Sequence, residues 1–403
     1  MTRIKLALAL AVVALGVSVS AGLAATSSGT PGVTAKSITI GGTFPLTGPA
    51  SLYSDIPKAE NAYFQYVNAH GGVNGRKINF LIEDDAYNPA QTVPQTQKLV
   101  QQSKVFADYG SLGTAPTLST RDYLNKLGVP QVLVATGDSY WGAQYKKYPW
   151  TIGFQPDYPG EGVIYGRFIR NKVPQAKIGV LIQDDAYGQN YYAGLLKGLG
   201  PAKSQIVDVE KYAATQTDVS QQVVKLKSSG ANVFALFALP TQTIDALAVA
   251  THIGWKPVTF INNVSNNPLF LYLAQKSGAD VQNDISTTYL YDIYNNPKSA
   301  TTKLLASILN QYDKGWNQLD GNNIYGLASA WTMVQALKNA GNPPTRAGLM
   351  KALTNLNEVN PFLFTGIKMQ TSAGERFPIE QESLEQYKGS TWVPFGRVYT
   401  KVK

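Results

Sequence analysis

The chain has 403 residues, of which 44% are hydrophobic and only 15% are charged, so it is long enough for two or three globular domains and carries too little charge to be disordered for that reason. Cysteine is absent and there are only two histidines, His70 and His252, which excludes disulfides, thiolate metal sites and cysteine nucleophiles and leaves little for a Ser-His-Asp triad. The net charge of +9 is scattered along the chain, so we expect a solvated basic surface and no nucleic-acid partner.

The first 25 residues are typical of an export signal. Two basic residues precede a continuous apolar run over residues 6–15, and a small-x-small pattern follows before residue 25, so we predict that residues 1–25 are removed. The alternative is an uncleaved membrane anchor, and the missing cysteine excludes a lipoprotein. Residues 26–36 are rich in Ser, Thr, Gly and Pro and predict a flexible leader. We expect the mature protein in the periplasm or secreted.

Short apolar runs alternate with longer stretches of helical spacing through the body of the chain. Because the strand candidates are apolar at nearly every position, they predict strands buried on both faces, as in parallel, doubly wound α/β sheets. The predicted strands are 38–44, 78–83, 105–109, 131–135, 178–182, 206–210, 233–238, 258–261 and 286–291. The predicted helices are 57–69, 93–102, 117–127, 160–171, 189–199, 219–228 and 241–252, with 300–313 and 324–339 in the last third.

One internal repeat stands out. Residues 81–87, Leu-Ile-Glu-Asp-Asp-Ala-Tyr, recur as Leu-Ile-Gln-Asp-Asp-Ala-Tyr at residues 181–187. Each copy lies at the carboxyl end of a predicted strand. Ligands of open α/β sheets collect at that end of the strands, so the repeat predicts two similar lobes that face each other across a cleft.

The common catalytic and nucleotide-binding motifs are missing: there is no phosphate-binding loop, no dinucleotide fingerprint, no nucleophile elbow and no His-Glu-x-x-His. Two acidic pairs remain, Asp84-Asp85 and Asp184-Asp185, which could bind a cation or act as acid and base. Asp at the end of a strand commonly caps the next turn, and we favour that interpretation, with a ligand contact from the loop of Asp185 as the alternative. We expect no cofactor, no metal and no enzymatic activity.

Several loops suit a small organic ligand. Aromatic residues occur where predicted strands pass into helices, namely Tyr53, Tyr87, Tyr140, Trp141, Tyr158 and Tyr187, and such side chains bury much area while keeping a polar tip. The segment 110–116 follows a strand and opens a helix, whose free N–H groups and the Thr114 hydroxyl form a natural seat for a carboxylate. A similar seat is expected at residues 135–138, although helix capping alone would also explain such residues.

The body of the chain resembles a known family through several motifs. These are Gly42-Thr43-Phe44-Pro45-Leu46-Thr47-Gly48-Pro49, the helix end Asn68-Ala69-His70-Gly71-Gly72-Val73-Asn74-Gly75-Arg76-Lys77, Asp84-Asp85 with Asn88-Pro89, Gly128-Val129-Pro130, Asp185-Ala186-Tyr187-Gly188 and Asn322-Asn323-Ile324-Tyr325-Gly326. Together they make the chain similar, from about Ile38 to its end, to the type I periplasmic solute-binding proteins of the branched-chain amino acid (Leu/Ile/Val) transport class.

The resemblance implies two α/β lobes joined by three crossovers, near Gly153, Ile285 and Arg376. The N-terminal lobe would comprise residues 37–153 and 286–375, and the C-terminal lobe residues 154–285 and 376–403. It also implies closure of the lobes on a small carboxylate-bearing ligand, which is then delivered to an ABC transporter permease with its ATPase subunits. A monomer is the family expectation.

The family's ligand-binding positions can be transferred to this sequence through the matching motifs. The transferred positions, with their immediate neighbours, are Tyr53, Leu112, Gly113, Thr114, Ala135, Thr136, Gly137, Asp185, Tyr187, Leu239, Pro240, Asn263 and Val264. Thr114 and the segment from Ala135 to Gly137 correspond to the seat of the ligand carboxylate, and Tyr53 and Tyr187 to pocket tyrosines.

Two positions depart from the amino-acid binders of the family. An aromatic residue is replaced by Leu239, and the acid that pairs with the ligand α-ammonium falls near Val264, in a stretch without any Asp or Glu from His252 through Ala279. A buried ammonium without an anionic partner is costly, so one hypothesis is a carboxylate ligand without a free α-amino group, such as an aromatic or short-chain acid. The other is an amino acid whose ammonium pairs with Asp184 or Asp185.

Three function classes compete at this point. The first is a transport-linked binding protein. The second is a ligand sensor that works through a separate signalling partner, since the same fold serves in receptors. The third is a secreted hydrolase, which the missing nucleophile motifs disfavour.

Overall fold

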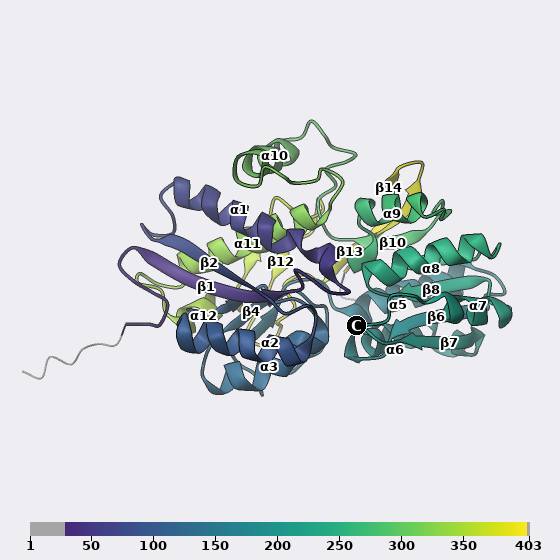
Figure 1. Cartoon of the computed structure of the whole chain (residues 1–403), viewed down its shortest axis with the longest axis horizontal. Coiled ribbons are helices and arrows are strands. Elements are labelled where there is room, and N and C mark those ends of the chain that lie inside the picture. Colours follow the sequence, from purple (N-terminus) through teal and green to yellow (C-terminus); the bar gives the residue numbers. More distant parts are fainter. Residues whose placement is uncertain (1–28, 401–403) are drawn as a thin grey trace, which may run out of the picture.

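A computed structural model describes residues 29–400, so the predicted signal segment lies outside the described residues. Two α/β bodies lie side by side along the longest axis of the molecule (Figure 1). The predicted fold class, two lobes built on parallel sheets, is confirmed. Within residues 29–400, no helix combines the length and the apolar character that crossing a bilayer requires.

The first body is built on a five-stranded sheet of order β2-β1-β3-β4-β5, in which all neighbours are parallel. Its strands are β1 (Ser37–Phe44), β2 (Lys77–Asp84), β3 (Asp108–Tyr109), β4 (Gln131–Val134) and β5 (Thr151–Gly153). Its helices are α1 (Asp55–Ala69), α2 (Pro89–Gln97), α3 (Thr114–Lys126), α4 (Tyr140–Ala143), α10 (Ala300–Tyr312), α11 (Asn322–Asn339) and α12 (Arg346–Leu353). A two-stranded ribbon of β11 (Asn357–Glu358) and β12 (Met369–Gln370) completes it.

The second body is built on a seven-stranded sheet of order β14-β13-β10-β9-β8-β6-β7. Its strands are β6 (Ile178–Gln183), β7 (Ile206–Tyr212), β8 (Val233–Phe237), β9 (Val258–Ile261), β10 (Ile285–Thr288), β13 (Gln381–Lys388) and β14 (Thr391–Thr400). Its helices are α5 (Tyr158–Lys172), α6 (Ala186–Leu199), α7 (Ser220–Ser228), α8 (Pro240–His252) and α9 (Pro268–Lys276). Strands β6 and β8 are buried at every residue, as expected for the centre of a parallel sheet covered on both faces.

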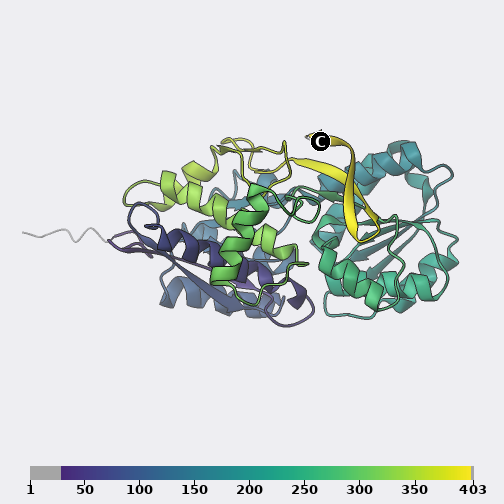
Figure 2. The ribbon, with the colours of Figure 1, turned by 90° about the horizontal axis from the view of Figure 1, so that it is seen from above.

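The hairpin β13–β14 distinguishes the second sheet. β13 pairs antiparallel with both β10 and β14, and Figure 2 shows this yellow hairpin beside the junction of the two bodies. The second crossover lies later than predicted, because Ile285 to Thr288 pair with β9 and β13 in the second sheet. Residues 286–288, expected in the N-terminal lobe, therefore belong to the second body, and the chain first pairs with the first body at the bridge between Leu290 and Leu363.

Close packing of α5 on α6 fixes the second body's edge of the cleft. A Cβ atom at Gly162 would lie 2.5 Å from the carbonyl oxygen of Tyr191, so only glycine permits this approach. As a result the first turns of α5 and α6 meet, and the rings of Tyr158 and Tyr187 lie 5.1 Å apart.

Candidate functional site

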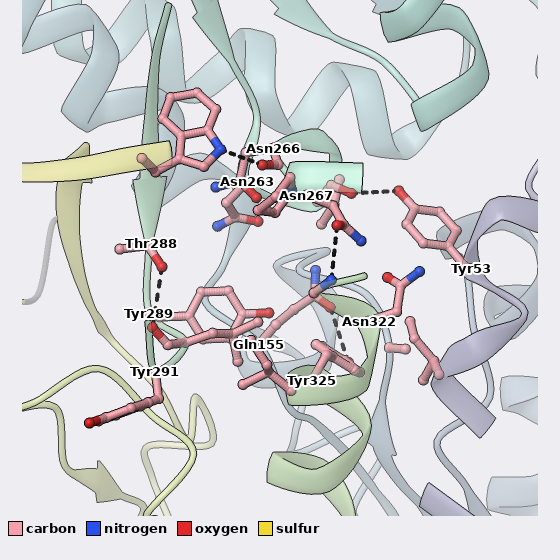
Figure 3. A pocket seen from close by; sticks show the side chains of 18 of the residues that line it. Tyr53, Gln155, Asn263, Asn266, Asn267, Thr288, Tyr289, Tyr291, Asn322 and Tyr325 are labelled. Carbon is pink, nitrogen blue, oxygen red and sulfur yellow. Dashed lines mark hydrogen bonds between the residues drawn. The ribbon is translucent and has the colours of Figure 1, made fainter. Parts of the chain in front are cut away.

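A cavity of about 130 Å³ lies between the two bodies, at the carboxyl ends of the parallel strands. Figure 3 shows side chains from both bodies around it. Its lining includes Tyr53, Ile56, Tyr87, Leu112, Gly113, Ala135, Gln155, Tyr158, Tyr187, Leu239, Asn263, Val264, Asn266, Asn267, Thr288, Tyr289, Asn322, Tyr325, Glu385 and Trp392. This is the location that the parallel topology predicts for a ligand.

The first-body wall is made by the loops after β3 and β4. Leu112, Gly113 and Ala135 line the cavity, and the Gly113 N–H donates to the Ala135 carbonyl at 3.1 Å, which joins the two loops. Helix α3 begins at Thr114, so its first N–H groups have no partner within the helix. Behind this wall the hydroxyls of Thr114 and Thr136 form a 2.7 Å hydrogen bond. Such a wall can receive an anion without any basic side chain.

Gly113 cannot be replaced by a residue with a side chain. Its φ is +101°, and a Cβ atom would lie 2.5 Å from Cε2 of Tyr87. Both the backbone conformation and the packing of the Tyr87 ring therefore require glycine here. Tyr87 in turn lines the cavity, so glycine at this loop lets an aromatic side chain from the loop after β2 reach the site.

Tyrosines dominate the rest of the wall. Tyr53, Tyr187 and Tyr289 are each less than a tenth exposed, and burial raises the pKa of all three hydroxyls well above the usual value. They remain neutral at physiological pH and can donate hydrogen bonds. The Tyr187 hydroxyl is hydrogen-bonded to the side-chain amide of Asn262. A wall of neutral phenols suits a flat or apolar organic ligand with few polar groups.

Hydrogen bonds join the bodies on either side of the cavity. The Tyr53 hydroxyl donates to the carbonyl of Val264 at 3.0 Å, as Figure 3 shows, and the Thr241 hydroxyl donates to the carbonyl of Pro49 at 3.0 Å. On another edge, the Asn190 side chain donates to Asp138 at 3.2 Å and accepts from the Ser139 N–H at 3.1 Å. The structure therefore represents a closed arrangement of the lobes.

The charged residues of the wall are acidic. Among the described residues that line the cavity there are two carboxyls, Asp292 and Glu385, and no Lys, Arg or His. Glu385 is 5% exposed, and burial together with the nearby Asp292 raises the pKa of its carboxyl well above the usual value. Asp292 is held by the N–H groups of Tyr294 and Asn295 at 3.0 and 2.9 Å.

The structure brings together eight of the thirteen residues that the sequence singled out. Those that line the cavity are Tyr53, Leu112, Gly113, Ala135, Tyr187, Leu239, Asn263 and Val264. The five that lie outside its lining are Thr114, Thr136, Gly137, Asp185 and Pro240. Thr114 and Thr136 lie directly behind the wall, whereas Pro240 is the first residue of α8.

Neither acid proposed as a substitute for the missing ammonium partner reaches the cavity. Asp185 caps α6: its carboxylate accepts from the Gly188 N–H at 3.3 Å and from the Gln183 side chain at 2.7 Å. The Asp184 side chain is 57% exposed and pairs with Lys211 at 2.8 Å. These positions favour the capping interpretation of the pair.

Sequence reasoning missed the residues that come from the crossovers and from the hairpin. Gln155 belongs to the first crossover, and its side chain accepts from the Tyr325 hydroxyl at 3.2 Å. Tyr325 lies near the start of α11, in a motif that carried the family resemblance. That position could have identified it as a candidate cavity residue. Glu385 and Trp392 come from β13 and β14, which the apolar pattern did not reveal.

Comparison with known proteins agrees with this geometry. The family model described as periplasmic binding protein matches residues 37–377. The Leu/Ile/Val-binding protein homolog 1 of Brucella suis biovar 1 is 24% identical over 309 residues, which cover 76% of this chain and 79% of the relative.

Solved structures show the same fold. A branched-chain amino acid ABC transporter protein from Thermus thermophilus, with bound valine, superposes with a TM-score of 0.79 at 18% identity, covering 91% of this chain and 97% of the other. A fatty acid ABC transporter substrate-binding protein from Thermomonospora curvata has a TM-score of 0.77 at 20% identity, covering 92% and 94%.

The family match spans most of the chain, and this family consists of solute-binding proteins rather than enzymes, with an extracytoplasmic location. The fold, the cavity between two lobes and the matched residues agree. The chain therefore belongs to the periplasmic binding protein family.

Proposed function

We propose that the protein is the substrate-binding component of an ABC importer, and that it holds a small carboxylate-bearing ligand in the cavity between its lobes. The observation that carries the proposal is the first-body wall, where the unpaired N–H groups at the start of α3 lie beside the hydroxyl pair of Thr114 and Thr136. A carboxylate there would accept from these backbone N–H groups, while the hydroxyl pair behind them joins the loops after β3 and β4. The closed lobes would present the loaded form to a membrane permease and its ATPase subunits.

The ligand class is an amino acid or an aromatic or aliphatic acid. Relatives of this fold are described with bound valine in one case and as fatty acid-binding in another, so the fold itself admits both classes. The tyrosine-rich wall supports a ligand with an apolar body. The proposal includes export through the segment 1–25, a leader over residues 26–36 and a monomeric mature protein.

The test is a thermal-shift and calorimetric screen of the mature protein. The panel holds Leu, Ile, Val, Phe, short aliphatic acids, benzoate and hydroxybenzoates, with glucose and putrescine as ligands that lack a carboxylate. Ligand at about a hundred times its Kd adds about 2.7 kcal/mol to the stability of the folded state, which raises Tm by a few degrees.

Variants link the binding to the proposed wall. Thr114→Val removes the hydrogen bond to Thr136 that joins the two loops behind the wall and should weaken carboxylate binding, whereas Thr34→Val at an exposed site should leave it unchanged. Stabilisation by glucose or putrescine, with every carboxylate silent, would overturn the proposal.

A further inference from the structure

The loop that follows β9 lacks an acid, yet its asparagines are hydrogen-bonded to two buried glutamates of β13. The Asn263 side chain donates to Glu382 at 2.8 Å, and the Asn266 side chain donates to Glu385 at 2.7 Å. The resemblance implies the ammonium-pairing acid near Val264, which lies between these two asparagines in the sequence. Buried carboxyls are therefore present beside the expected place, but they belong to β13, two strands away from β9 in the sheet.

The two glutamates have different surroundings. Glu382 is 4% exposed, and one of its oxygens accepts from both Asn263 and the Thr287 hydroxyl, at 2.8 Å each. It lies outside the lining of the main cavity. Glu385 lines that cavity, and only its Oε1 accepts a hydrogen bond, from Asn266. Among the residues 29–400, no donor reaches its Oε2, so this oxygen is available to a ligand.

The electrostatic surroundings of Glu385 favour a positive partner. A buried carboxylate needs a counter-charge or several donors, and Glu385 has one donor. The other carboxyls that act on it are Asp292 and Glu161, which add negative charge, and the described lining contains no cation. Burial and Asp292 therefore raise the pKa of the carboxyl, and a cation placed in the cavity would favour its ionised form.

We propose that Glu385 binds a cationic nitrogen of the ligand and replaces the acid that the loop after β9 lacks. The ligand is then a zwitterion, with its carboxylate at the start of α3 and its ammonium toward β13. This inference rests on the proposed function, because it assumes that the same cavity holds the carboxylate. It selects the amino-acid class over acids that lack an amine, with the anion supplied by β13 rather than by Asp184 or Asp185.

The test uses two matched pairs of probes in isothermal titration calorimetry. L-leucine is paired with 4-methylpentanoate, and 4-(aminomethyl)benzoate with 4-methylbenzoate, so that the members of each pair differ only in the amine. We expect at least one zwitterion to bind the mature protein about tenfold or more tightly than its amine-free partner.

The informative variant is Glu385→Gln, because its amide oxygen still accepts from Asn266 and so keeps the fold. It should weaken zwitterion binding about tenfold or more and leave the amine-free acid within about twofold. Glu382→Gln, on the same strand but outside the cavity, is the matched control and should leave both affinities unchanged. Binding to wild-type protein should release a proton from Glu385, seen as a binding heat that differs between phosphate and Tris buffers, and this difference should vanish in Glu385→Gln.

Three outcomes would overturn the proposal. If the amine-free acids bind wild-type protein as tightly as the zwitterions, the amine contributes nothing to binding and Glu385 is not its partner. An equal loss of both probe types in Glu385→Gln would make Glu385 a structural residue. If none of the four probes binds a protein whose circular dichroism spectrum is native, the carboxylate assignment of the proposed function fails, and the zwitterion fails with it.

Discussion

The repeated segments 81–87 and 181–187 both end in a tyrosine that lines the cavity, but their backbones differ in conformation just before it. In both copies the chain leaves a parallel strand, β2 or β6, and Tyr87 and Tyr187 line the cavity from opposite bodies. In the first copy Ala86 and Tyr87 have φ values of 51° and 58°, whereas in the second Ala186 already begins α6. Identical residues thus reach one cavity through a turn and through a helix.

The residues that follow explain the difference. Pro89 is the first residue of α2, and Asn88 before it is extended, with its side chain accepting from the Ala90 N–H. A residue before proline is disfavoured in the helical region, so the helix of the first copy begins only at residue 89. In the second copy Gly188 follows the tyrosine, and Asp185 caps the helix directly. The residues after the tyrosine therefore determine where the helix begins. The position of the tyrosine after the strand determines that its side chain lines the cavity.

The largest expected loss of stability in either copy comes from its tyrosine. The Tyr187 ring packs against Tyr158 and Tyr191, with centroids at 5.1 and 5.5 Å, whereas Tyr87 has no such ring pair among the described residues. Tyr187→Ala should lower the free energy of unfolding by about 3–5 kcal/mol. Tyr87→Ala should cost about 1 kcal/mol less because aromatic pairs add about 0.5–1.5 kcal/mol.

Urea unfolding measures both costs. Tyr272→Ala, at a side chain that is 42% exposed, is the control and should change the stability by less than about 0.5 kcal/mol. Equal costs at the two cavity tyrosines would show that the ring pairs add nothing to the second copy.

The first aspartates of the two copies sharpen the comparison. Asp84 accepts from the N–H groups of Leu46 and Thr47 at 3.0 and 3.2 Å, from the Thr47 hydroxyl at 2.7 Å and from the Ala86 N–H at 2.9 Å. It ties the loop after β1 to the end of β2. Asp84→Ala should therefore cost about 2 kcal/mol of unfolding free energy.

Among residues 29–400, the Asp184 side chain has only the exposed pair with Lys211, so Asp184→Ala should cost less than about 0.5 kcal/mol. Both values come from chemical unfolding at low and high salt, where added salt should weaken only the Asp184 pair. A cost above about 1 kcal/mol at Asp184 would contradict this contrast.

The sequence predicted those parts of the fold and of the candidate site whose residues are buried in a regular apolar pattern. Strand β6, predicted at 178–182 and observed at Ile178–Gln183, was visible because all of its residues are buried. The loops after β3 and β4 were located well enough to bring Leu112, Gly113 and Ala135 into the lining. The direction of Thr114 and Thr136 was not predictable, because the side-chain torsions that turn both hydroxyls toward each other leave no trace in the spacing.

The hairpin β13–β14 was not predictable from apolar pattern at all. β13 reads Gln-Glu-Ser-Leu-Glu-Gln-Tyr-Lys, and it buries Glu382 and Glu385. Glutamates are almost never fully buried without a partner. A sequence-based prediction therefore treats a segment with two glutamates as exposed. The partners are Asn263 and Asn266, more than a hundred residues away, and only the folded chain reveals them.

The smallest expected effect is a pH dependence at Asp85 of the first copy. Burial raises the pKa of Asp85 to about 6, although its carboxylate accepts from the Thr92 hydroxyl and the Tyr87 N–H at 2.9 Å each. An unfolded aspartate has a pKa of about 3.9, so between about pH 4 and pH 6 the native state holds more protons than the unfolded state. The free energy of unfolding contributed by this group therefore falls as pH rises through that window.

Asp85→Asn removes the ionisable group and keeps an oxygen acceptor for the Tyr87 N–H. Relative to wild type, the variant should gain about 1–2 kcal/mol of unfolding free energy between pH 4.5 and pH 7.5, measured by urea titration at each pH. Asp184→Asn, at the exposed position of the second copy, is the control and should run parallel to wild type. If Asp85→Asn also ran parallel, the carboxyl would ionise without cost in the folded protein, and the two hydrogen bonds from Thr92 and Tyr87 would have to compensate its burial completely.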